Sequence, residues 1–434
     1  MEAQKFMRIN RLLASYRLLL VTLAVLLAVM PLAACDSGEE TEISLAEYGS
    51  YGADFALKLA TEYPNRSPGS DQEQAAGDLI IKEFKSLGYT PIVTTFTFAD
   101  NEGNSFTSRN IAVLIEGSGF NRTLPSGQID SFKSQVIVGA HYDTTVTAEQ
   151  AAAAQPTTEE TTTAAPGETS ETSDTSVPVP TLADCDGIHD NASGIGTLMT
   201  IAREIKKYQF GYDVILVAFG AGSAGQAGSR WFSSQLGTAD LSKTNVMYCI
   251  DSIYAGDKIY AHAGRRSALG GDRKDYEKRR KLYEVTDVFY ENELYTNNAY
   301  MLYTNQSSLM LELEGFSEKV VYREWSLNDS DYLPFDDQGI PVVFFESFDY
   351  NEDSLEDMKE SQNPAFGETG GMIRGTNFDA SDFLQRLLNT KLTAATGDDA
   401  EAQKTVDKLV KRINNTSFII LEAINKGIHN AEKR

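Results

Sequence analysis

The sequence predicts an α/β fold with a mixed, mostly parallel central β-sheet that is flanked by helices on both faces. Strand-like apolar runs alternate with helix-like amphipathic stretches along most of the 434 residues. Polar residues follow directly after several of the strand-like runs, where ligands bind in such folds. Hydrophobic residues make up 41% of the chain, which is enough for one large domain or two ordinary ones.

The first predicted elements are two helices and three strands. Helical patterns cover residues 45–62 and 72–87, and Gly88 provides a stop after the second. Runs rich in β-branched and aromatic residues then predict strands at PIVTTFTF, RNIAVLIEG and QVIVGAHYD.

Residues 145–180 interrupt this alternation. They consist mostly of Thr, Ala, Glu, Ser and Pro, and no Lys or Arg occurs between Lys133 and Arg203. Such a composition buries too little apolar surface to offset the entropy of ordering. We therefore expect a disordered, low-complexity insertion inside one domain that spans residues 45–430.

The alternation resumes after the insertion. Helices are predicted at residues 193–207, 229–235, 273–292, 378–390 and 400–426. Strands are predicted at DVILVAFG, TNVMYCID, IYAHA and GIPVVFFES.

The amino terminus resembles a bacterial lipoprotein signal peptide over residues 1–35. Four basic residues precede an apolar run at 18–32, which is too short for a confident membrane span. The run ends in Leu-Ala-Ala-Cys, which resembles a lipobox with Cys35 as the lipidated residue. We expect residues 36–44 to tether the domain to the outer face of the cytoplasmic membrane, in the bacterial cell envelope. The alternative is an ordinary signal peptide or an uncleaved anchor, with Cys35 incidental.

The net charge argues against one class of binding partner, and the cysteine content allows one disulfide. The formal net charge of −24 argues against nucleic acid as a partner. The basic segment at residues 264–281 is either a solvated surface or a cationic patch for an acidic partner or an anionic membrane. Cys185 and Cys249 could form a disulfide outside the cytoplasm or remain buried free thiols.

Candidate metal ligands follow the strand-like runs. His141 and Asp143 end VIVGAHYD, Asp190 precedes a helix, and Asp251 ends VMYCID. One imidazole and two carboxylates suit Zn²⁺ or a similar divalent ion. Asp143 would either accept a hydrogen bond from the second ring nitrogen of His141 or fix the local backbone. Each residue also has an ordinary alternative, because Asp190 would serve equally as a helix N-cap and Asp251 as a turn residue.

Several segments of the chain occur together in a known family. They are NRSPGSDQEQAAGDLIIKEFKSLGY, VIVGAHYDT, DNASGIG, FGAGSAGQAGS, NVMYCIDS and SDYLPFDDQGIPVVFF. In this order they resemble the co-catalytic zinc exopeptidases of clan MH, peptidase family M28, which includes bacterial leucine aminopeptidases and has glutaminyl cyclases among its relatives. The resemblance covers residues 56–348 and implies the zinc-exopeptidase fold. It also implies a two-metal site in which His141 and Asp251 hold one ion and Asp190 bridges both.

The second half of that site departs from the family pattern. Family loops read approximately GAEExGLxGS, whereas this chain reads GAGSAGQAGS at residues 220–229. Gly222 thus stands at the general-base position and Ser223 at that of a second-metal ligand. Tyr332 replaces the remaining ligand, a histidine. Glycine cannot accept a proton, and serine and tyrosine are poor zinc ligands.

Three other residues are candidate substitutes for the missing groups. His189 adjoins Asp190, and Asp329 and Asp331 lie next to Tyr332 in the sequence. The alternative for the two aspartates is a solvated loop, and adjacent side chains such as His189 and Asp190 usually point apart.

We therefore expect a lipid-anchored, extracytoplasmic protein with the aminopeptidase fold and impaired catalysis. It would bind a peptide or another partner and hold at most one ion, Zn²⁺ or another divalent metal. One alternative is an active exopeptidase with an unusual one-metal site. Another is an envelope- or carbohydrate-binding lipoprotein that uses only the scaffold.

Overall fold

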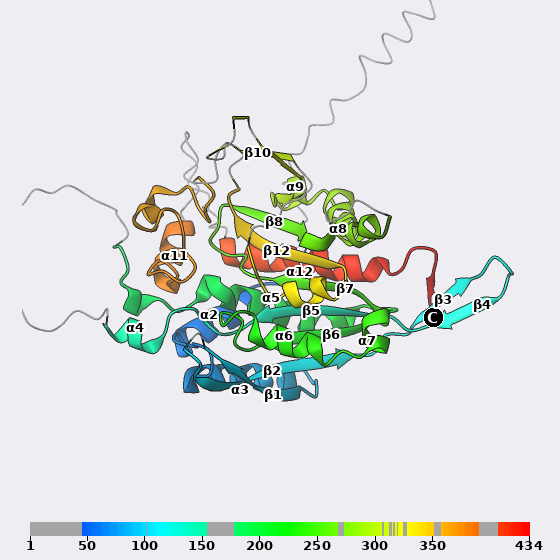
Figure 1. Ribbon diagram of the computed structural model, residues 1–434, viewed down its shortest axis with the longest axis horizontal. Coiled ribbons are helices and arrows are strands. Elements are labelled where there is room, and N and C mark those ends of the chain that lie inside the picture. Colours follow the sequence, from blue (N-terminus) through cyan, green and yellow to red (C-terminus); the bar gives the residue numbers. More distant parts are fainter. Residues whose placement is uncertain are drawn as a thin grey trace, which may run out of the picture. The chain divides into compact units, whose positions relative to one another are not determined.

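An eight-stranded sheet forms the centre of the computed structural model (Figure 1), in the order β1-β2-β6-β5-β7-β12-β8-β9. The strands are β1 (Ile92–Ala99), β2 (Ser105–Ile115), β5 (Gln135–His141), β6 (Asp213–Phe219), β7 (Thr244–Ile250), β8 (Lys258–Ala263), β9 (Leu302–Thr304) and β12 (Val342–Phe348). The structure describes residues 46–434 except 101, 154–177, 268–272, 306–307, 312–314, 316, 319, 324–327, 351–356 and 390–406.

The middle of the sheet is parallel and its margins are mostly antiparallel. Strands β6, β5, β7 and β12 pair in parallel, whereas β1, β2 and β8 join by antiparallel pairing. Every residue of β5 and β12 is buried, as expected for strands covered on both faces. The predicted fold class is confirmed.

Helices cover both faces of the sheet. Val136 and Val138 of β5 belong to the apolar core that also contains residues of α2, α3, α5, α8 and α12. Ile137, which points to the opposite face, packs with α6 and α10. The helices are α2 (Tyr51–Glu62), α3 (Asp71–Ser86), α5 (Ser193–Glu204), α6 (Ala227–Ser234), α7 (Thr238–Lys243), α8 (Arg273–Glu291), α9 (Leu294–Asn297), α10 (Leu333–Asp337), α11 (Ser381–Leu388) and α12 (Lys408–Lys426).

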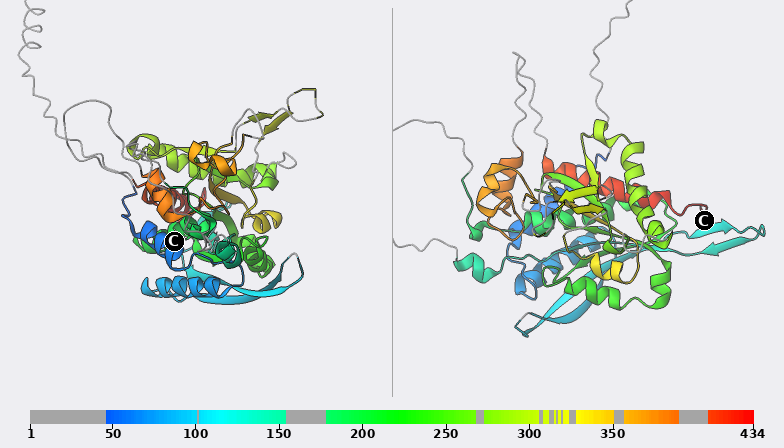
Figure 2. Two further views of the ribbon diagram at one scale, coloured as in Figure 1. Left: turned by 90° about the vertical axis from the view of Figure 1, so that its left-hand side faces the viewer. Right: turned by 45° about the horizontal axis from the view of Figure 1, so that its top comes forward.

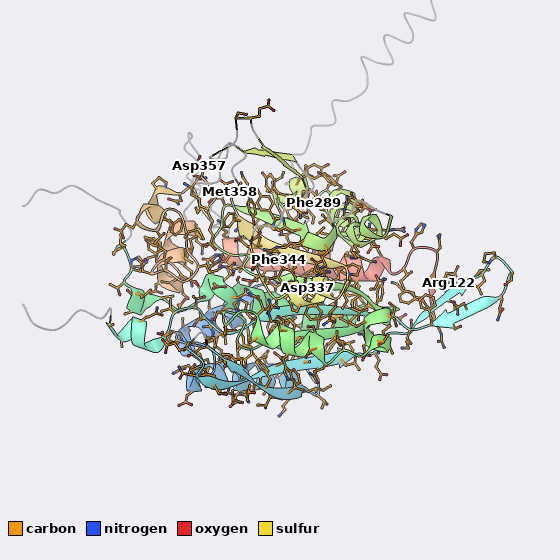
Figure 3. All side chains as sticks on the ribbon, in the orientation of Figure 1. Arg122, Phe289, Asp337, Phe344, Asp357 and Met358 are labelled. Carbon is orange, nitrogen blue, oxygen red and sulfur yellow. The ribbon has the colours of Figure 1, made fainter. Side chains whose placement is uncertain are left out.

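Two small sheets complete the described structure. Strands β3 (Phe120–Thr123) and β4 (Ile129–Phe132) form a hairpin to which β13 (Glu432–Lys433) adds a third strand. The hairpin extends beyond the helices that flank the main sheet (Figures 1 and 2). Figure 3 shows Arg122 on this hairpin and Phe344 within the main sheet. Strands β10 (Ser308–Leu311) and β11 (Val320–Arg323) pair separately. The sequence analysis predicted none of these short strands.

The structure describes short parts of the expected insertion at both of its ends, residues 145–153 and 178–180. Residues Ala148–Ala153 form helix α4, and Val146 is buried against Cys185 and Leu182. Residues 154–177 lie outside the described residues, as do the signal peptide with Cys35 and the tether. Cys185 and Cys249 are both buried free thiols, so no disulfide joins them. Within the described ranges, no helix is long and apolar enough to cross a bilayer.

Candidate metal centre

The candidate ligands meet in a cavity of about 180 Å³ at the carboxyl ends of the parallel strands. His141 is the last residue of β5, Asp251 follows β7, and Asp190 lies in the turn before α5. The described residues that line the cavity are His141, Thr145, Asp190, Gly222, Ser223, Gln226, Asp251, Asp329, Ser330, Asp331 and Arg374.

His141, Asp190 and Asp251 form a compact triad, which we call the metal triad. The Nε2 atom of His141 lies 3.4 Å from Oδ1 of Asp190 and 3.4 Å from Oδ1 of Asp251. One ligand atom from each residue lies within 4.8 Å of the others, and all three residues are buried. One imidazole nitrogen and two carboxylate oxygens suit Zn²⁺ or another divalent ion, so the residues present fit one metal ion.

The triad also has a strong affinity for a proton. Burial disfavours the imidazolium form of His141, but the nearby carboxylates of Asp251, Asp143 and Asp190 outweigh it and raise the His141 pKa well above its usual value. A metal ion that binds Nε2 must displace a proton from this ring, so metal affinity should fall at low pH.

Asp143 lies behind the imidazole and fixes the loop that follows β6. Its carboxylate accepts hydrogen bonds from the backbone N–H groups of Gly222 (2.6 Å) and Ser223 (2.8 Å) and from the Ser223 hydroxyl (2.6 Å). It also lies 3.4 Å from Nδ1 of His141. Burial opposes ionisation of Asp143, but His141 and Ser223 outweigh it and lower its pKa. The Ser223 hydroxyl proton is therefore committed to Asp143.

The loop itself packs closely on the histidine. A β-carbon added at Gly222 would lie 2.3 Å from Cβ of His141 and 2.5 Å from its Cγ. The preceding residue, Ala221, has φ of 52°, and its backbone N–H donates to the buried carboxylate of Glu73 at 2.8 Å. Glu73 was not predicted as a site residue, because a glutamate within the amphipathic helix α3 gives no indication of a contact with a distant loop.

Tyr332 is part of the apolar core and not of the described cavity lining. Its side chain is fully buried and stacks on Phe344 with ring centroids 4.9 Å apart. Its hydroxyl donates to the backbone carbonyl of Asn328 at 3.1 Å. The side chain at position 332 therefore serves packing in this structure.

The three candidate substitutes differ in where they lie. Nδ1 of His189 accepts a hydrogen bond from the Ala255 N–H at 3.2 Å and Nε2 faces Glu360 at 3.1 Å, so both ring nitrogens are engaged away from the cavity. Asp329 lines the cavity but is exposed and paired with Arg265. Asp331 lines the cavity and is buried.

Asp331 carries a buried carboxyl group that is available to bind a cation or a proton. Neither oxygen accepts a hydrogen bond from any described residue. The nearby Ser229 hydroxyl donates to the Gln226 carbonyl instead. Burial raises the pKa of Asp331 to about 7, partly offset by the nearby His141.

Arg374 is the second residue that sequence analysis missed. It follows the 3₁₀ turn Pro364–Thr369 and lies beyond the segments that carry the family resemblance. Its guanidinium lies 3.2 Å from Oδ1 and 3.3 Å from Oδ2 of Asp251. It also lies 3.8 Å from Oδ1 of Asp190, so one cation already faces two of the triad's carboxylates.

Comparisons with known proteins agree with this arrangement. The family model described as Peptidase family M28 matches residues 123–374. The alkaline phosphatase isozyme conversion protein of Escherichia coli is 24% identical over 219 residues, which cover 50% of this chain and 54% of that protein. The match thus spans about half of the length of this relative.

Solved structures share the fold at low identity. A zinc aminopeptidase from Bacillus subtilis has a TM-score of 0.52 at 12% identity, with 88% of this chain and 97% of that chain covered. A glutaminyl cyclase from Porphyromonas gingivalis has a TM-score of 0.50 at 15% identity, with 87% and 98% covered. Because the family model spans more than half of the sequence and includes the whole metal triad, this chain belongs to peptidase family M28.

Proposed function

We propose that this chain is a lipid-anchored, extracytoplasmic member of its family that binds peptide amino termini without hydrolysing them efficiently. At most one divalent ion, Zn²⁺ in the first instance, would bind at the metal triad. The observation that carries the proposal is the contact between Gly222 and His141, which leaves no room for a general base where the family places one.

Hydrolysis by this site would be limited by proton transfer. Peptide hydrolysis needs a metal-activated water and a group that takes its proton and delivers it to the leaving amine. Gly222 has no side chain, and the space beside it is filled by the imidazole. Loss of a general base costs on the order of 10²- to 10⁴-fold in rate. Two carboxylates that neutralise one dication should also lower the pKa of a bound water less than a histidine-rich site does.

The peptide proposal rests on a carboxyl group of the cavity wall that lies outside the metal triad. Asp331 lines the same cavity as the triad, and neither of its oxygens accepts a hydrogen bond from any described residue. A carboxylate in this position would favour a positively charged group such as a free α-amino group. Short peptides with a free amino terminus should therefore bind to the protein. Acetylation of that terminus should remove most of their affinity. Equal binding of free and acetylated peptides would contradict the proposal.

An active one-metal exopeptidase is the second candidate, and one observation favours it. Asp331 is buried in the cavity wall and has a pKa of about 7, which suits a general base near neutral pH. Its oxygens are not part of the compact ligand group. Turnover of aminoacyl-arylamides that Asp331→Asn abolishes, with Zn²⁺ binding unchanged, would favour this candidate over the first.

Membrane attachment is proposed from the lipobox alone. Cys35→Ala should leave the precursor unprocessed or release the protein from the membrane. Lipid labelling of this variant at the level of the wild type would contradict attachment through Cys35.

A further inference from the structure

The guanidinium of Arg374 lies against the same oxygen atoms that a metal ion at the triad needs. Oδ1 of Asp251 is 3.4 Å from the imidazole Nε2 of His141 and 3.2 Å from Nη2 of Arg374. Nη1 also donates to the second oxygen of Asp251 at 3.3 Å. Asp251 is thus held by a two-pronged arginine pair, a geometry that adds both strength and specificity.

Arg374 is positioned by its own backbone as well as by its side chain. Its N–H donates to Oε2 of Glu360 at 2.8 Å, and the N–H of Ile373 donates to the same oxygen. The other oxygen of Glu360 faces His189 at 3.1 Å and lies 3.7 Å from Nε of Arg374. A buried carboxylate therefore holds the segment that carries the arginine and directs the guanidinium toward the triad.

A metal ion and this guanidinium would repel each other. A divalent ion coordinated by Asp190 and Asp251 would lie within a few ångströms of a group that stays positively charged at all accessible pH values. At such separations, like charges in a partly buried site interact strongly. Among the described cavity residues, Arg374 is the only arginine or lysine, so no other fixed cation there has this effect.

We propose that Arg374 is a built-in cation that competes with divalent metal for the carboxylates of the triad. It neutralises part of the charge that a second ion balances in a two-metal site, and it keeps the affinity for a first ion low. This inference rests on the proposed metal triad of His141, Asp190 and Asp251.

Metal titration of the wild type and of arginine variants tests the proposal. Chelator-treated protein is titrated with Zn²⁺ by calorimetry and with Co²⁺ by visible absorption, which reports the ligand geometry without any need for activity. Arg374→Gln and Arg374→Met should each bind Zn²⁺ about tenfold tighter or more, because the repelling charge is gone. Arg374→Lys keeps a charge but loses the two-pronged geometry, so its affinity should fall between those of wild type and Arg374→Gln.

Two further variants test whether the change in Zn²⁺ affinity is specific to Arg374 and to the metal triad. Arg122→Gln is the matched control, because Arg122 forms an ion pair with Asp130 on the β3–β4 hairpin, outside the cavity (Figure 3). It should leave Zn²⁺ affinity unchanged. The double variant Arg374→Gln with His141→Ala should lose the gain, since the ion would then lack its imidazole ligand.

The outcomes distinguish a failure of the proposed role of Arg374 from a failure of the metal triad itself. If the neutral variants bind Zn²⁺ no tighter than the wild type, or more weakly, the competing role of Arg374 is overturned while the triad stands. If neither the wild type nor any variant binds Zn²⁺ or Co²⁺, the triad and the role of Arg374 both fail. The two neutral variants differ in polarity, so poor folding of one leaves the other to decide.

Discussion

A β-carbon on Gly222 would lie 2.3 Å from the β-carbon of His141. Real β-carbons do not approach each other so closely, so any side chain at position 222 must move the loop or the histidine. Under the proposed match to the family loop this is the general-base position, and a carboxylate there would need a further change beside the substitution itself.

Gly222→Ala should destabilise the protein by about 1–3 kcal/mol, the range typical of overpacking. Gly222→Glu should do the same and should not produce peptidase activity. Urea unfolding measures the free-energy change. Gly367→Ala is the control, because no described atom lies within 4 Å of a β-carbon there, and its effect should stay small. Equal stability of the Gly222 and Gly367 variants would show that the loop moves freely away from His141.

Ser223→Ala should lower the free energy of unfolding by about 1.5–3 kcal/mol, the range for a hydrogen bond to a charged group. The variant removes the 2.6 Å hydrogen bond from the hydroxyl to Asp143 and keeps both backbone donors. Ser234→Ala removes a hydroxyl that donates to the Trp231 carbonyl on the surface of α6 and should have little effect. An unchanged stability in Ser223→Ala would show that its hydroxyl does not hold Asp143.

Asp331→Asn should change how stability depends on pH. The folded-state pKa of Asp331 is about 7 because of burial, whereas an unfolded Asp titrates near 3.9. Between these values the native state keeps a proton that the unfolded state has lost, so the contribution of Asp331 to stability falls as pH rises from about 4 to about 7, by up to roughly 4 kcal/mol.

The Asp331→Asn variant should lack this part of the pH slope, as measured by denaturation in a chelator at a series of pH values. Asp329→Asn, at the exposed neighbour, should keep the wild-type profile. If the stabilities of wild type and Asp331→Asn change with pH in the same way, Asp331 is ionised in the native protein well below pH 7.

Tyr332→His should destabilise the protein and should not add a second ion. The ring stacks on Phe344 inside the apolar core, so a smaller polar ring there costs packing and burial, about 2 kcal/mol or more. Tyr332→Phe keeps the stack and loses the hydrogen bond to Asn328, at a cost of about 1 kcal/mol. A rise in Zn²⁺ stoichiometry in the histidine variant would show that this side chain can turn toward the cavity.

The fold could be predicted because strand and helix periodicity are local properties. The alternation of apolar runs and amphipathic stretches is enough to indicate a sheet covered on both faces. The sequence also places His141 and Asp251 at the ends of predicted strands and Asp190 just before a predicted helix, and the structure brings the three together. The short strands β3, β4, β10 and β11 were missed because runs of four residues carry little periodicity.

The remaining features of the site depend on contacts between distant segments. The family resemblance places Gly222 in the same site as His141, but nothing in the sequence indicates that the two residues are in contact. Nothing near Arg374 indicates that it faces Asp251. In the sequence, nothing distinguishes Glu73 from an ordinary helix residue. Only the structure shows that it accepts a hydrogen bond from the N–H of Ala221. At one edge of the low-complexity insertion Val146 is buried beside Cys185, a contact that composition alone does not indicate.

Zn²⁺ stoichiometry and aminopeptidase turnover, measured together on one preparation, test the impaired-site proposal most directly. Wild-type and His141→Ala proteins would be stripped with chelator, reloaded with Zn²⁺, analysed for metal content and assayed on aminoacyl-arylamides. We predict at most one ion per wild-type chain, none at the triad of the variant, and no appreciable hydrolysis by either. Two ions per wild-type chain, or robust hydrolysis that His141→Ala abolishes, would contradict the proposal.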